Sequence, residues 1–122
     1  MKSYRFYFDL RAKAYGKKGF DLFLARGLDT LKTYDYTTIL GGVWLRVDFS
    51  LRTKRHVSLD KLINSVVILL KKAKVIKYKS QIKRVTASKK IRQPLDVFII
   101  EIVEIEPLIE RLSDEQKSKI II

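Results

Sequence analysis

Residues 43–51 have the sequence VWLRVDFSL, in which apolar and polar side chains alternate almost without a break. Successive side chains of a strand point to opposite faces of a sheet, so alternation with a period of two is typical of a half-buried strand. We therefore predict a strand over Val43–Leu51 with one buried face. Its polar face carries Trp44, Arg46, Asp48 and Ser50.

A helix is predicted after this strand and the basic loop at residues 52–57. Ser58 is a suitable N-cap, and Asp60 in the first turn suits the positive end of the helix dipole. Apolar residues then recur at helical spacing and predict one broad buried face. They are Leu59, Leu62, Ile63, Val66, Val67, Leu69, Leu70 and Ala73, and the helix closes with Lys71, Lys72 and Lys74.

Two further elements are expected upstream of residue 43. The aromatic-rich stretch Tyr4–Leu10 predicts a strand. A loop with two glycines and four basic residues follows at Arg11–Gly19. Phe20–Lys32 has helical apolar spacing, and Gly27 inside it costs about 1 kcal/mol relative to alanine. A small residue there could allow close packing.

Downstream, two strands are expected, over Val75–Ser88 and over Leu95–Ile105, which is dense in β-branched residues. Pro107 should stop the second strand, and Leu108–Lys119 could form a short terminal helix. The order is therefore strand, helix, strand, helix, strand, strand. We predict an α/β (α+β) fold over residues 1–122, a single domain with a mixed four-stranded sheet and helices packed on one face.

The formal net charge is +13, and one segment carries it. Residues 52–92 contain 14 Lys or Arg and one acid, whereas the remaining basic and acidic residues balance. Concentrated positive charge of this kind predicts a polyanionic partner, with nucleic acid favoured over an anionic membrane surface. The candidate contacts are Arg52, Lys54, Arg55, His56, Lys61, Lys71, Lys72, Lys74, Lys77, Lys79, Lys83, Arg84, Lys89, Lys90 and Arg92.

The sequence lacks the residues and motifs that several kinds of metal, nucleotide-binding and catalytic site require. With no cysteine and one histidine, thiolate and histidine zinc sites are excluded. There is no P-loop, GxGxxG or GxSxG motif, and no apolar run of about 18 residues that could span a membrane. We expect a soluble intracellular protein, cytoplasmic, nucleoid-associated or viral.

From Leu45 to Lys89 the chain resembles the RusA family of Holliday-junction resolvases. The resemblance lies in a strand and basic loop, then SLDKL at residues 58–62 opening a helix, then YKSQ at residues 78–81 before the next strand. It implies a RusA-like domain, a homodimer and a four-way DNA junction as partner. In the family, cleavage depends on Mg²⁺ held by aspartates.

The resemblance fails at most catalytic positions. The family has acids where this chain has Ser58, Tyr78 and Lys79, and only Asp60 is retained. Lys61 and Asn64 also replace the family's asparagine and lysine. An ammonium at position 79 would repel a cation, so we expect no cofactor, with Mg²⁺ only if an active site has been rebuilt from Asp48 and Asp60.

Three functions remain open. The first is a RusA-like protein that binds branched or duplex DNA, as in recombination or repair, without cutting it. The second is an active Mg²⁺-dependent junction endonuclease with a relocated acidic site. The third is an RNA-binding or nucleoprotein structural component. Trp44 and Tyr78 could stack on exposed bases, although Trp44 also fits a half-buried position in the sheet.

Overall fold

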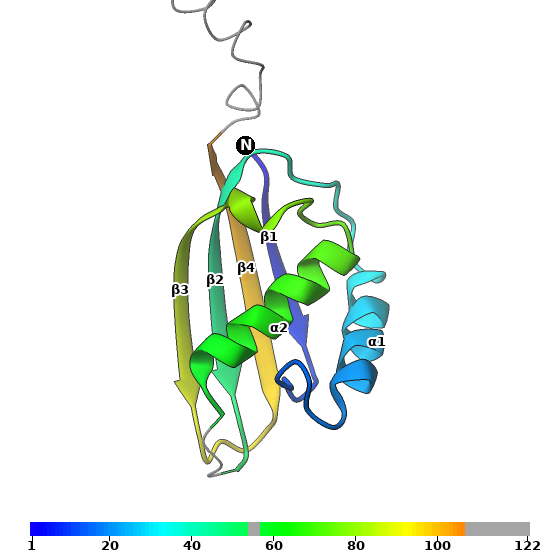
Figure 1. Ribbon diagram of the computed structural model, residues 1–122, viewed down its shortest axis with the longest axis vertical. Coiled ribbons are helices and arrows are strands. Elements are labelled where there is room, and N and C mark those ends of the chain that lie inside the picture. The colour runs from blue at the N-terminus through cyan, green and yellow to red at the C-terminus, as the bar shows by residue number, and fades with distance from the viewer. Residues whose placement is uncertain (54–56, 107–122) are drawn as a thin grey trace, which may run out of the picture.

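Residues 1–53 and 57–106 are described by the structure, a computed structural model. A mixed four-stranded sheet has the strand order β1-β4-β2-β3, and two helices cover one of its faces (Figure 1). The elements are β1 (Ser3–Phe8), α1 (Phe20–Leu31), β2 (Gly42–Ser50), α2 (Leu59–Lys72), the single 3-10 turn η1 (Lys79–Gln81), β3 (Ile82–Lys90) and β4 (Val97–Glu106). The predicted fold class is confirmed.

The strand directions define two edges of the sheet. β1 and β2 are both antiparallel to β4, and β3 is parallel to β2, so β1, β2 and β3 run the same way. We call the edge where these three strands end the carboxyl edge, and the edge where they begin the amino edge. In Figure 1 the carboxyl edge is at the bottom, where both helices also begin.

The core lies between the sheet and the helices. Val43, Leu45, Val47 and Phe49 of β2 are buried, whereas the side chains between them lie on the opposite, open face of the sheet. The predicted alternation is therefore confirmed, with strand bounds one residue earlier. The first strand also ends earlier than predicted, because Asp9 and Leu10 already belong to the loop.

Gly27 lets the two helices approach closely. A Cβ atom built on Gly27 would lie 2.9 Å from both terminal carbons of the buried Leu69 side chain. Two non-bonded carbon atoms do not approach this closely in real structures. A glycine therefore fits this point of contact between α1 and α2. The expected helix over Phe20–Lys32 is observed as Phe20–Leu31.

The predicted strand over Val75–Ser88 is wrong in its first half, because β3 begins only at Ile82. The end of α2 causes this change. The Val75 N–H donates to the Leu70 carbonyl and the Lys74 N–H to the Lys71 carbonyl, the two bonds of a Schellman cap. The two residues that follow the cap, Val75 and Ile76, are buried. Ile76 makes only an isolated bridge with Ile39. The apolar pattern there reflects burial of the segment that connects α2 to η1.

Lys74→Gly should raise the free energy of unfolding by about 0.5–1 kcal/mol. Lys74 has a φ of 61°, a left-handed conformation that costs a residue with a Cβ atom more than it costs glycine. Chemical denaturation measures the change. Lys74→Ala removes the same charge but keeps the Cβ atom, so equal stability of the two variants would contradict the backbone explanation.

The proposed terminal helix Leu108–Lys119 and the stop at Pro107 lie outside the described residues, as do Lys54, Arg55 and His56. Among the described residues, no helix has the length and apolar character needed to cross a membrane.

Candidate nucleic-acid interface

A cavity at the carboxyl edge brings together cations from two distant parts of the chain. Its volume is about 400 Å³, and it lies between the loop after β1 and the start of α2. All the charged side chains that line it are cations, among the residues that the structure describes. The lining consists of Arg11, Ala12, Lys13, Ala14, Lys17, Lys18, Val57, Ser58 and Lys61. We call Arg11, Lys13, Lys17, Lys18 and Lys61 the carboxyl-edge cations.

Local folding holds the loop of residues 9–19 in place. Ala12, Ala14 and Phe20 are buried, and the Lys17 N–H donates to the Ala14 carbonyl in a tight turn. An Arg11 Nη2 group donates to Thr53 Oγ1 at 3.1 Å, which joins this loop to the one after β2. Buried alanines therefore anchor a loop whose lysines line the cavity.

The beginning of α2 adds positive potential to the same cavity. Ser58 is the N-cap, as predicted, but its side chain makes no capping hydrogen bond. The first N–H groups of a helix have no partner within the helix, and they form the positive end of its dipole. A phosphate or another anion is therefore favoured beside Ser58 and Lys61. Asp60 is in the same turn, but it does not line the cavity.

Other predicted contacts at this edge have different environments. Arg52, Lys90 and Arg92 are exposed at the ends of β2 and β3, but they do not line the cavity. Lys89 is half-buried, and its ammonium donates to the Val57 carbonyl at 2.6 Å. Lys89 thus joins β3 to the chain before α2, which is a structural contact that its sequence position did not reveal.

A second group of predicted contacts lies at the opposite, amino edge. Lys71, Lys74 and Lys77 line a depression of about 410 Å³ with Thr38, Leu40 and Ile76, and Lys72 and Lys79 are exposed nearby in sequence. This is the negative end of α2. Hydroxyl groups bond the carbonyls directly after the helix, since Tyr36 donates to the carbonyl of Ala73 and Thr38 to that of Lys74. Burial raises the pKa of Tyr36, which keeps this donor protonated.

Described cations of the basic segment therefore line two separate cavities, one at each end of α2. A helix of the length of α2 is about 20 Å long, and it separates Lys61 from Lys74. Lys83 and Arg84, both exposed, lie on the edge strand β3. The helix dipole distinguishes the two ends, because it favours anions at the carboxyl edge and cations at the amino edge.

The structure does not bring together the two candidate catalytic acids. Asp48 is on the open face of β2 and accepts a hydrogen bond from Ser88 Oγ at 2.5 Å. Asp60 is exposed on α2, on the other side of the sheet. Within residues 1–53 and 57–106, no group of three His, Asp or Glu side chains is arranged to hold a metal ion. Asp48 and Asp60 thus do not fit a shared Mg²⁺ site within one chain.

The four positions at which the RusA family has acids are also divided in this fold. Ser58 and Asp60 are at the start of α2, whereas Tyr78 and Lys79 are beyond its end, beside η1. Lys79 therefore lies far from Asp60 within one chain, and the repulsion expected between Lys79 and a cation at Asp60 does not arise there.

Four cavity residues were missed by the charge count, namely Arg11, Lys13, Lys17 and Lys18. The signal for them was the basic loop with two glycines at Arg11–Gly19. That loop follows one strand, and the basic loop at residues 52–57 follows a second strand that runs parallel to it. Loops after parallel strands meet at one edge and often form binding sites.

Comparison of the chain with protein-family models and with curated proteins finds no match.

Proposed function

We propose that this protein binds DNA through the carboxyl-edge cations, with backbone phosphates entering the cavity at the start of α2. The observation that carries the proposal is a cavity lined by Arg11, Lys13, Lys17, Lys18 and Lys61, with no acid among its described lining residues. Ammonium and guanidinium groups bind phosphate oxygens directly, and the N–H groups of the helix add further donors.

Binding without cutting is the form of the proposal that the geometry supports best. Metal-assisted hydrolysis needs convergent oxygen ligands beside the scissile phosphate. Asp48 and Asp60 lie on opposite faces of the sheet, and all the charged side chains among the described residues that line the cavity are positive. This charge favours holding a phosphate over holding Mg²⁺.

The finer parts of the proposal come from the resemblance to the RusA family. A homodimer would present two carboxyl edges to one four-way junction, so branched DNA is the proposed preferred ligand. The corresponding location is the cytoplasm, on chromosomal or viral DNA. Competition between junction DNA, linear duplex and structured RNA at matched salt tests this preference. Equal binding to all three would favour the RNA or nucleoprotein alternative.

Reversing two charges in the cavity should weaken DNA binding strongly. We expect Lys17→Glu with Lys61→Glu to lower the affinity for a duplex of about 20 base pairs roughly a hundredfold. The slope of log K against log salt is negative, and each lost phosphate contact should make it shallower by about 0.9. Fluorescence anisotropy at several salt concentrations measures both. The two lysines are exposed, so the variant should fold.

Lys71→Glu with Lys77→Glu is the matched control, because it makes the same charge change at the amino edge. Its affinity should fall less than about tenfold, since these lysines act only through screened, long-range attraction. Equal losses in the two variants would contradict the assignment to the carboxyl edge. If the unmodified protein contacts six to ten phosphates, its affinity should fall about 10³–10⁵-fold between 50 and 200 mM salt. A flat salt dependence would refute the proposal.

Incubation of labelled four-way junctions with Mg²⁺ or Mn²⁺ tests the alternative of cleavage. We expect bound, intact junctions. Cleavage that is lost in both Asp48→Asn and Asp60→Asn would instead support the relocated active site.

A further inference from the structure

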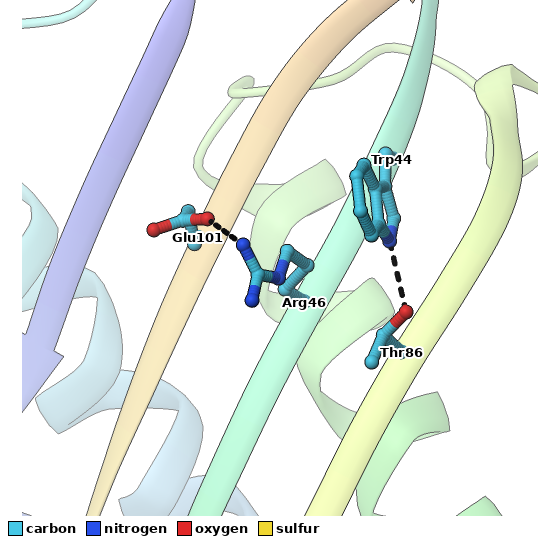
Figure 2. Close-up of polar contacts among 4 residues, drawn as sticks. All are labelled: Trp44, Arg46, Thr86 and Glu101. Atoms are coloured by element: carbon cyan, nitrogen blue, oxygen red, sulfur yellow. Dashed lines mark hydrogen bonds and ion pairs between the residues drawn. The ribbon is translucent and has the colours of Figure 1, made fainter.

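The open face of the sheet carries an aromatic and cationic cluster far from the cavity. Trp44 and Arg46 of β2 lie beside Arg84 and Thr86 of β3, because the register pairs Trp44 with Arg84 and Arg46 with Thr86. Figure 2 shows Trp44, Arg46, Thr86 and Glu101 on the side of the sheet away from the helices.

The Trp44 ring is held in one orientation. Its Nε1–H group donates to Thr86 Oγ1 at 3.0 Å, across to the neighbouring strand (Figure 2). The Arg84 guanidinium carbon lies 4.1 Å from the ring centroid, and that of Arg46 lies 5.2 Å away. An aromatic ring fixed in this way loses little further freedom when a planar ligand stacks near it.

The two arginines beside Trp44 differ in charge balance. Arg46 forms an ion pair with Glu101 at 2.8 Å, so a carboxylate already balances its charge. Arg84 is exposed, and no described carboxylate forms an ion pair with it. A planar cation thus lies against an indole ring and keeps its charge available for a ligand.

We propose that Trp44 and Arg84 form a stacking site for an unpaired nucleic-acid base. This inference rests on the proposed function and adds a ligand class, a single strand or the unpaired bases of a branch point. Bases stack on aromatic rings and on guanidinium planes, and a nearby arginine can also contact the phosphate. Bases within a duplex are already stacked on their neighbours and cannot present a free ring face to Trp44.

The chain contains one tryptophan, so its fluorescence reports directly on this site. Saturation with an oligothymidylate of about 12 nucleotides should lower Trp44 emission by roughly half, because a stacked base quenches the indole. A duplex, or an abasic oligomer with the same number of phosphates, should cause little change. Binding of every ligand is measured in parallel by anisotropy with a label.

Arg84→Ala tests the second half of the site. We expect about a tenfold loss of affinity for the single strand and less than a threefold loss for duplex DNA. Lys32→Ala is the control, since it removes an exposed charge beyond the end of α1 and should affect neither ligand. Arg84 is exposed on an edge strand, so its replacement should leave the fold intact.

The outcomes separate this inference from the proposed function. Single-strand binding with unchanged Trp44 emission, or equal quenching by the abasic oligomer, overturns the stacking site and leaves DNA binding at the carboxyl edge in place. Equal losses for both ligands in Arg84→Ala also overturn it. If anisotropy detects no binding of any nucleic acid, the proposed function and this inference both fail.

Discussion

Gln81→Leu should lower the free energy of unfolding by about 3 kcal/mol, because it removes buried hydrogen bonds between the Gln81 side chain and the backbone. The Gln81 side chain is fully buried. Its amide oxygen accepts hydrogen bonds from the N–H groups of Lys77 and Tyr78, at 2.7 and 2.8 Å. Its amide group donates to the carbonyls of Ile39 and Gly41 at 2.8 and 2.9 Å. Leucine satisfies none of these four backbone groups.

Urea denaturation followed by circular dichroism measures this loss. Ser80→Ala is the control, since the neighbouring Ser80 is exposed and its replacement should change stability by less than about 0.5 kcal/mol. Gln81→Glu keeps the accepting oxygens but places a carboxylate against two carbonyls, so it should also be destabilising. An unchanged denaturation midpoint for Gln81→Leu would show that water replaces these bonds without cost.

Gly41→Ala should destabilise the protein by about 3 kcal/mol or more, through a steric overlap with main chain. A Cβ atom on Gly41 would overlap the backbone carbonyl oxygen of Glu106 and lie 3.0 Å from a Glu104 carboxylate oxygen. Main chain in a sheet cannot rotate away as a flexible side chain does. The φ of Gly41 is outside the left-handed region, so the cost is not conformational.

Gly16→Ala is the matched control for this substitution. Gly16 has a φ of 79° but open space where a Cβ atom would lie, so alanine there should cost only about 1 kcal/mol. Thermal or urea denaturation of both variants compares the two effects. Similar small losses at the two positions would contradict the overlap at Gly41.

Both predictions concern the amino edge, which differs in character from the carboxyl edge. Gln81 and Gly41 are bonded to each other there, and Gly41 lies against the end of β4. At the carboxyl edge, loops carry lysines around a cavity. The amino edge is thus held by buried contacts between distant segments. At the carboxyl edge, exposed lysines such as Lys17 and Lys61 can be replaced with little change in packing.

The sequence alone predicted the main elements, because their patterns depend on nearby residues. The alternation of residues 43–51 predicted β2, and the apolar face after Ser58 predicted α2. The periodicity of apolar residues indicates which side chains are buried, and it correctly predicted the buried faces of β2 and α2. The predicted strand was wrong at Val75 and Ile76. These residues are buried in the segment between α2 and η1, and their burial follows from packing after the cap of α2.

The grouping of the charges was decided only by the tertiary structure. Charge counting predicted one basic segment, but α2 separates Lys61 from Lys74, and the path of the chain brings Arg11 and Lys17 to Lys61. The roles of Lys89, Gln81 and Trp44 likewise depend on neighbours more than 30 residues away. Local sequence determines each element and its buried face. The strand order decides which faces and loops meet. This order depends on long-range pairing, since β4 lies between β1 and β2.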